Sequence, residues 1–96
     1  MAAALIVRHR VANFEAWKSI FDGMTQARRS HGWTSVIVFR DAVDPNMVTI
    51  VNRVKDLDRA KRYAGSPELR TAMQNAGVQS IPEIVFAEEV EETSIN

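Results

Sequence analysis

The sequence predicts an α+β sandwich, a single domain over residues 1–96, in which helices cover one face of a four-stranded antiparallel sheet. Two segments repeat apolar residues at helical spacing, and four short segments rich in Val and Ile have the composition of strands. The chain has 96 residues, of which 46% are hydrophobic and 25% charged, as is ordinary for a small globular domain. The predicted order, strand–helix–strand–strand–helix–strand, is the ferredoxin-like arrangement.

The first half of the chain predicts a strand followed by an amphipathic helix. Residues 5–11 form the expected strand, and Asn13 is a suitable N-cap for the helix after it. Arg28 and Arg29 in the last turn favour the negative end of the helix dipole and are expected to be solvated, and Gly32 then suits a left-handed turn. The apolar stripe of this helix consists of Phe14, Trp17, Ile20, Phe21, Met24 and Ala27.

The second half predicts a hairpin, a broken helix and a final strand. The Asp-Pro-Asn segment 44–46 favours the turn of the hairpin. The second helix begins at Asp56 or Asp58, and the Gly-Ser-Pro-Glu segment 65–68 indicates a break and a restart before Gly77 ends it. The three remaining strands are expected at residues 33–40, 47–55 and 81–90.

The two hairpin strands are apolar on both faces, which predicts a homodimer. Neither residues 35–39 nor residues 47–51 alternate apolar with polar side chains, yet the helices can cover only one face. The other face would leave hundreds of Å² of apolar surface in water, a patch size that marks an interface. Pairing of Arg40 with Met47 would decide which side chains of the hairpin lie on each face of the sheet. A shift of this pairing by one residue would exchange the two faces. With Arg40 opposite Met47, Val36, Val38, Thr49 and Val51 meet the second subunit, and Trp33, Ser35, Ile37, Phe39, Ile50 and Asn52 lie under the helices.

A group of polar and aromatic residues predicts a small-molecule site between the sheet and the helices. We expect the first and third strands to be parallel neighbours, which would bring His9 and Asn52 to the same end of the sheet. His9 titrates near neutral pH and is the candidate acid or base. Asn52 and Ser35 are candidate anchors for a carbonyl or a phenol. The candidate aromatic walls are Trp33, Phe39, Tyr63 and Phe86.

Each of these residues also has a purely structural interpretation. A single His at a strand end is more often a satisfied structural residue than a catalyst. Asn52 and Ser35 could hydrogen-bond to each other or to helix-end backbone, as buried polar groups normally must. Met24 and Met73 are more often gap-fillers than part of a pocket.

The composition argues against several other classes of protein. Twelve basic residues balance twelve acidic ones and no Lys/Arg-Gly-Phe motif is present, so we expect no nucleic-acid partner. With no cysteine, and with His9 and His31 poorly spaced as ligands, we expect no metal site. Arg8 interrupts the apolar start too early for a signal peptide, and no stretch has membrane-spanning length. A cytoplasmic protein with no membrane contact is the expectation.

Several short motifs distributed along the chain carry a family resemblance. They are Val7-Arg8-His9, Asn13-Phe14-Glu15-Ala16-Trp17-Lys18 with Phe21-Asp22, Phe39-Arg40-Asp41 with Asp44-Pro45-Asn46, Ser66-Pro67-Glu68-Leu69 with Met73, and Ala76-Gly77-Val78. With the predicted element order, they resemble the dimeric α/β-barrel superfamily, and within it the antibiotic-biosynthesis-monooxygenase-like group, which includes small proteins labelled as cyclases. The resemblance implies a homodimer whose two sheets face each other, with a pocket between each sheet and its own helices. It also implies that a catalytic member needs no metal or flavin, because an electron-rich phenolic substrate can supply the electrons for oxygen.

We therefore expect a cofactor-independent monooxygenase-like or cyclase-like protein that holds a small aromatic or polyketide-type ligand. The alternative is a non-catalytic ligand-binding or stress-related accessory dimer, whose pocket is filled by its own Phe and Met side chains. The volume of the cavity beside His9 distinguishes the two, since a value below roughly 300 Å³ favours the non-catalytic alternative.

Overall fold

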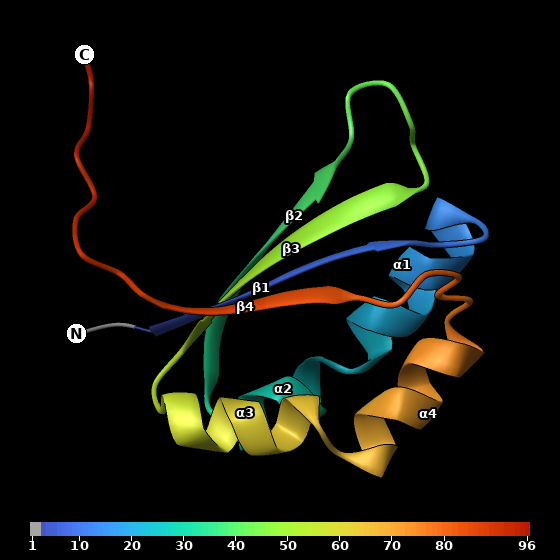
Figure 1. The fold of residues 1–96 in the computed structure, drawn as a ribbon, viewed down its shortest axis with the longest axis horizontal. Coiled ribbons are helices and arrows are strands. Elements are labelled where there is room, and N and C mark those ends of the chain that lie inside the picture. The colour runs from blue at the N-terminus through green and yellow to red at the C-terminus, as the bar shows by residue number, and fades with distance from the viewer. Residues whose placement is uncertain (1–2) are drawn as a thin grey trace.

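The computed structural model describes residues 3–96, which form a four-stranded antiparallel sheet with the helices on one of its faces (Figure 1). The strand order across the sheet is β2-β3-β1-β4. In chain order the elements are β1 (Ala3–Arg10), α1 (Phe14–Gly23), α2 (Thr25–Ser30), β2 (Trp33–Arg40), β3 (Met47–Val54), α3 (Leu57–Ala64), α4 (Pro67–Asn75) and β4 (Glu83–Glu88). The predicted fold class, an α+β ferredoxin-like sandwich, is confirmed.

The capping residues read from the sequence set several helix boundaries. The Asn13 side chain accepts a hydrogen bond from the amide of Ala16 at 2.9 Å, and so caps α1. Ser66 caps α4 in the same way, with Pro67 at the first helical position, which confirms the predicted break between α3 and α4. Gly77 follows α4 with a φ of +79°, the left-handed conformation that glycine adopts without strain.

The first helical segment was predicted as one helix, but it breaks at Met24 into α1 and α2. Two local features explain the break. Gly23 is a weak helix former, and the Thr25 hydroxyl donates to the carbonyl of Asp22 at 2.8 Å, which competes with the helical backbone pattern. Within α2, Arg28 is buried, whereas the sequence had predicted it to be solvated.

β1 and β3 are neighbours in the sheet, but they are antiparallel and not parallel as predicted. The prediction was wrong because the helical crossover makes β1 and β2 run the same way, and the hairpin then reverses β3. His9 pairs with Val48, whereas Asn52 pairs with Leu5. His9 and Asn52 of β3 therefore share the helix-covered face, but His9 lies near the end of β1 and Asn52 lies beside Leu5, near its start.

A β-bulge in β2 changes which of its side chains face the helices. Trp33 lies in the predicted register, but from Ser35 onward the strand is shifted by one residue relative to β3. The hairpin loop fixes this shift, since the amide of Asp41 donates to the carbonyl of Met47 at 2.9 Å. Met47 is thus opposite Asp41 and not opposite Arg40, as the sequence had suggested.

The shift exchanges the predicted faces of β2, because side chains alternate along a strand with a period of two. Val36 and Val38 were predicted on the dimer face, but they lie under the helices and pack against the core. Ser35, Ile37 and Phe39 were predicted under the helices, but they lie on the face that no helix covers. We call this the open face. The β3 assignment was right: Val48, Ile50, Asn52 and Val54 face the helices, and Thr49, Val51 and Arg53 lie on the open face.

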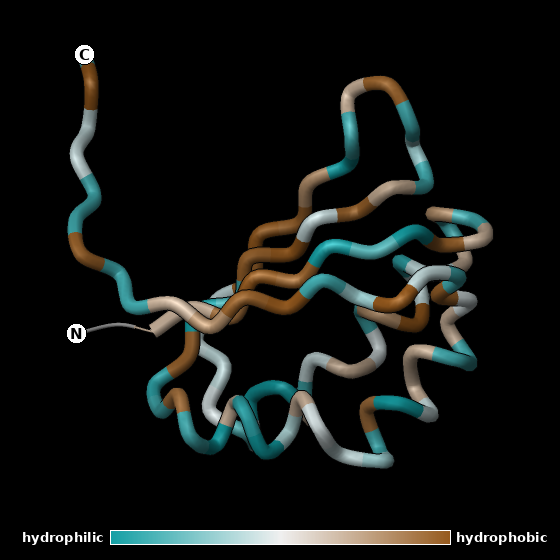
Figure 2. Tube along the Cα trace, viewed as in Figure 1, coloured by the Kyte–Doolittle hydropathy of each residue, from teal (hydrophilic) through white to brown (hydrophobic). Residues whose placement is uncertain are grey.

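The core fills the space between the sheet and the helices. Figure 2 shows the most hydrophobic positions concentrated along the strands, while the hairpin loop and the helices carry many hydrophilic ones. Buried core residues include Leu5, Val7, Val11, Trp17, Trp33, Val48, Ile50, Val54, Ala60 and Tyr63. Within residues 3–96, no helix is both long enough and apolar enough to cross a membrane.

Candidate functional site

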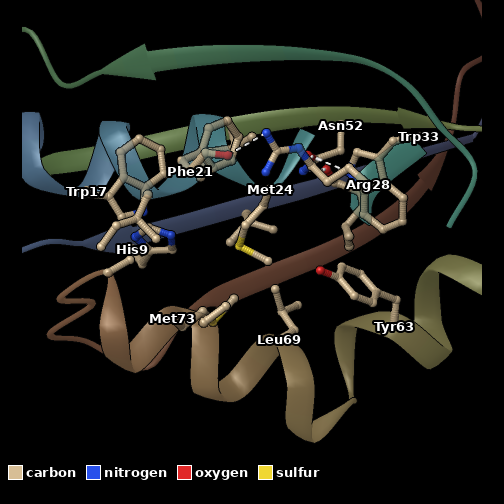
Figure 3. A pocket seen from close by; sticks show the side chains of 16 residues that line it. His9, Trp17, Phe21, Met24, Arg28, Trp33, Asn52, Tyr63, Leu69 and Met73 are labelled. Atoms are coloured by element: carbon tan, nitrogen blue, oxygen red, sulfur yellow. Dashed lines mark hydrogen bonds between the residues drawn. The ribbon is translucent and has the colours of Figure 1, made fainter. Parts of the chain in front are cut away.

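The sheet and the helices enclose a cavity of about 80 Å³. Strands β1, β2 and β3 and all four helices contribute to its wall, most of which is apolar (Figure 3). Aliphatic, Met and aromatic side chains form this apolar part, including Trp17, Phe21, Met24, Leu69 and Met73. The lining side chains that carry nitrogen or oxygen atoms are His9, Arg28, Trp33, Asn52 and Tyr63.

His9 extends from β1 into the cavity wall and is only 4% exposed. Its ring meets the Trp17 ring edge-on, with the centroids 5.8 Å apart. Burial lowers the pKa of His9, so the imidazole is neutral near pH 7. Among residues 3–96, its Nδ1 atom finds no hydrogen-bond partner. His9 is thus a neutral, buried imidazole with an unused nitrogen, which is the state a proton acceptor requires, and its catalytic role stays a prediction.

The lowered pKa of His9 makes folding stability depend on pH. Below about pH 6.5 the imidazole of the unfolded chain binds a proton that the folded protein binds less readily. The contribution of His9 is therefore complete above that pH and is lost as the pH falls, at up to about 1.4 kcal/mol per pH unit. Urea titrations at pH 7.5 and pH 5 are expected to show a smaller loss of stability for His9→Gln than for the wild type. Equal losses in the two proteins would contradict a buried neutral imidazole.

Asn52 and Trp33 lie together in the cavity wall, as predicted, but they are bonded within the fold. The Asn52 Oδ1 accepts a hydrogen bond from the Trp33 indole N–H at 2.8 Å. Its Nδ2 donates to the carbonyl of Leu5, also at 2.8 Å. These bonds join β2, β3 and β1, so the structural interpretation describes Asn52 and the Trp33 indole better than a ligand-anchoring role does.

Tyr63 on α3 was predicted as an aromatic wall, and its ring does line the cavity. The residue is 4% exposed, and its hydroxyl has no hydrogen-bond partner within the described part of the chain. Burial raises the pKa of this hydroxyl, which keeps its proton at neutral pH. A buried hydroxyl without a partner is costly, so Tyr63 offers a donor to whatever enters the cavity.

Arg28 was predicted as part of a solvated helix end, but it is 9% exposed and lines the cavity. Its guanidinium lies 3.8 Å from the centroid of the Phe21 ring, and Nη2 donates to the Phe21 carbonyl at 2.7 Å. The sequence held a signal for this placement, because Phe21, Met24 and Arg28 are three and four residues apart and continue the apolar stripe. The prediction instead followed the general rule that a basic residue in a last turn interacts with the helix dipole and is solvated.

Three of the predicted site residues lie elsewhere. Ser35 and Phe39 are on the open face, away from the cavity, because of the register shift in β2. Phe86 is on the helix-covered side of β4 but outside the cavity wall, with the Lys61 ammonium 5.5 Å from its ring centroid. No group of three or more His, Asp or Glu side chains within residues 3–96 is placed to hold a metal ion.

No protein-family model matches the chain, and no curated protein matches it in sequence. Its fold does match solved structures. One is an antibiotic biosynthesis monooxygenase, with 12% identity, 93% of this chain and 99% of that chain covered, and a TM-score of 0.68. Another is Rv0793 from Mycobacterium tuberculosis, which is 17% identical in sequence and has a TM-score of 0.68. The match covers 98% of this chain and 100% of Rv0793. A third is SnoaB, a cofactor-independent oxygenase from Streptomyces nogalater, which is 15% identical and has a TM-score of 0.70. The match covers 93% of this chain and 95% of SnoaB. The chain therefore has the antibiotic-biosynthesis-monooxygenase-like fold that the sequence resemblance predicted.

Proposed function

We propose that the protein is a cofactor-independent, monooxygenase-like protein that acts on a small, electron-rich phenol held in the cavity. One observation carries the proposal: His9 and Tyr63, in the wall of a largely apolar cavity, each have a buried polar atom without a hydrogen-bond partner among residues 3–96. Buried polar groups are normally satisfied, and an unsatisfied pair in one cavity is typical of a binding site. The fold supports the reaction class, since one solved structure that shares it is a cofactor-independent oxygenase.

In this proposal, His9 accepts the phenolic proton, and the resulting phenolate is electron-rich enough to react with O₂. The substrate loses two hydrogen atoms and gains one oxygen atom, which supplies four electrons. The second oxygen atom leaves as water together with the two hydrogens, so the reaction consumes no further reductant. Burial beside the largely apolar wall lowers the pKa of His9 and keeps the imidazole neutral, as a proton acceptor must be.

The size of the cavity restricts the ligand. At about 80 Å³ it is smaller than the roughly 150 Å³ apolar cavity that admits benzene. A single ring therefore enters only if the flexible side chains of Met24 and Met73 change rotamer, and a multi-ring polyketide is too large. We accordingly propose a single-ring phenol or hydroquinone and not the polyketide-type ligand that the sequence also suggested.

Oxygen uptake by the purified protein with a panel of hydroquinones and substituted phenols tests this function. The wild type is expected to consume one O₂ per substrate and to yield a product heavier by one oxygen and lighter by two hydrogens. His9→Gln removes the proton acceptor and is expected to lower the rate about 10²- to 10⁴-fold. Thr71→Ala, on the exposed surface of α4, is the control and should keep the wild-type rate. No turnover by the wild type, or equal activity in His9→Gln, would reject the proposal.

A second candidate function is ligand binding without chemistry, and the cavity volume favours it. About 80 Å³ lies well below the roughly 300 Å³ at which typical ligand pockets begin. Phe21, Met24 and Met73 already occupy part of the space between the sheet and the helices. If this alternative holds, the same phenols raise the melting temperature of the protein but are recovered unchanged.

We further propose that the protein is a homodimer whose subunits pack through their open faces. Ile37, Phe39 and Val85 on this face remain 40%, 52% and 53% exposed in the single chain. Thr49 and Val51 stay in the proposed interface, while Val36 and Val38 leave it because they pack against the core. Apolar side chains from all four strands thus share a face without a helical cover, as expected for a surface that meets a second copy.

A further inference from the structure

We infer that Arg28 and Tyr63 form a carboxylate-binding subsite, so that the preferred ligand of the cavity is a single-ring aromatic acid. The inference rests on the proposed small-molecule function and adds the charge and orientation of the ligand. It follows from three features of residues 3–96: a buried cation that forms no ion pair, a buried donor without an acceptor, and their position in the wall of one cavity.

Arg28 is a buried cation without an ion-pair partner in the described chain. The ion pairs among residues 3–96 involve Arg10, Lys18 and Arg53, and none involves Arg28, although the Asp22 carboxylate acts on its charge from beyond ion-pair distance. The hydrogen bonds that Arg28 donates within the described residues come from Nη2, to the Phe21 carbonyl at 2.7 Å and, at 3.5 Å, to the Thr25 hydroxyl. A guanidinium has five N–H donors, so most of its capacity is unused. Buried charges are normally paired, and a ligand carboxylate would supply the missing partner.

Tyr63 provides the second, independent observation. Its ring is held by a stacked contact with His31, at 4.1 Å between centroids, and an edge contact with Trp33 at 5.4 Å. Its hydroxyl is buried without an acceptor among residues 3–96. Burial and the negative charge of Glu68 raise the pKa of Tyr63, and the positive charge of Arg28 only partly offsets the rise, so the hydroxyl keeps its proton at neutral pH and is a donor. Arg28 and Tyr63 thus contribute two groups of hydrogen-bond donors to the wall of one cavity.

The arrangement of the wall gives the ligand a direction. In Figure 3, Arg28 and Tyr63 lie toward the Trp33 end of the cavity, and His9 and Trp17 lie toward the other end. A carboxylate at the Arg28–Tyr63 end would accept hydrogen bonds from both residues. The ring of the ligand would then extend past the apolar middle of the cavity toward His9, which can receive the proton of a ring hydroxyl.

Isothermal titration calorimetry with three matched compounds tests the subsite. The compounds are 2,5-dihydroxybenzoate, its neutral amide and hydroquinone, which share one ring and two hydroxyls but differ in the charged group. The wild type is expected to bind the acid at least about tenfold more tightly than the amide. Arg28→Met should abolish this preference, Arg28→Lys should retain part of it, and Tyr63→Phe should reduce it severalfold. Arg29→Met is the control and should bind like the wild type, because Arg29 is exposed and outside the cavity wall.

The results distinguish a failure of the carboxylate subsite from a failure of the proposed reaction. If hydroquinone and the amide bind as tightly as the acid, the carboxylate subsite is wrong and a neutral-phenol pocket stands. If the acid is preferred through Arg28 but no oxygen is consumed, the subsite stands and the oxygenase function is wrong. If none of the three compounds binds, both are overturned. If Arg28 is purely structural, its replacement would lower the melting temperature but leave the ratio of the affinities for the acid and the amide unchanged. The melting temperature and this ratio are therefore measured for each variant.

Discussion

Replacing Phe39 with Asp is expected to convert the proposed homodimer into monomers. Phe39 is 52% exposed on the open face, where the proposed interface is apolar. A carboxylate buried there without a partner costs several kcal/mol, enough to raise the dimer dissociation constant about 100-fold or more. Sedimentation velocity over a range of protein concentrations measures the change. Val43→Asp in the hairpin loop, where Val43 is 91% exposed, is the matched control and should leave the dimer intact.

Val38→Asp tests the register that underlies this prediction. Val38 neighbours Phe39 in β2 but is partly buried on the helix-covered face, so the same substitution there should destabilise each subunit instead of separating two folded subunits. A monomeric wild type, or a Phe39→Asp variant that stays dimeric, would contradict assembly through the open face. A folded monomer from Val38→Asp would contradict the observed register.

Replacing Asn52 with Leu is expected to lower the free energy of unfolding by about 2–4 kcal/mol. The substitution keeps the approximate size of the side chain but leaves the Trp33 indole N–H and the Leu5 carbonyl buried without their partner. Each such group costs about 1–3 kcal/mol, and the total is a large fraction of the roughly 5–15 kcal/mol that stabilises a small domain. Urea denaturation monitored by Trp fluorescence and by circular dichroism measures the loss.

Asn75→Leu is the matched control for this measurement, because Asn75 is exposed at the end of α4. Its effect is expected to stay within about 0.5 kcal/mol. A loss of similar size in Asn52→Leu would mean that the bonds of Asn52 to Trp33 and Leu5 add little to stability. Asn52 would then again be a candidate for hydrogen-bonding a ligand.

The parts of the fold that depend on local chemistry were predictable from the sequence. Asn13, Ser66 and Gly77 mark helix ends through their own hydrogen bonds or backbone freedom, and the structure uses each of them in that way. The four strands were recognisable from composition, although the last is shorter than expected, at Glu83–Glu88. These features require no knowledge of distant contacts.

The faces of β2 could not be predicted, because both of its alternating sets of side chains are apolar. Val36 and Val38 would suit a core as well as Ile37 and Phe39 would, so the hydrophobic pattern does not favour either register. The choice depends on the bulge after Trp33 and on hydrogen bonds in the hairpin loop, which are properties of the folded chain.

The cavity was partly predictable. His9, Trp33, Asn52 and Tyr63 were selected for their chemistry, and all four line it. Arg28 was missed because a basic residue in a last turn was taken to interact with the helix dipole, although its spacing continued the apolar stripe. The expected grouping of His9 with Asn52 failed for a topological reason, since it assumed the wrong relative direction of two neighbouring strands.

The bulge in β2 allows the side chains of its two segments to face different sides of the sheet. On one side of it, Trp33 is tied to Asn52 in the cavity wall, and on the other, Ile37 and Phe39 face away from the cavity. The extra residue, Thr34, absorbs the mismatch between the two registers. Substitutions that alter self-association can therefore accumulate at positions 37 and 39 without displacing the Trp33–Asn52 bond. A relative with different quaternary structure could in this way retain the same cavity.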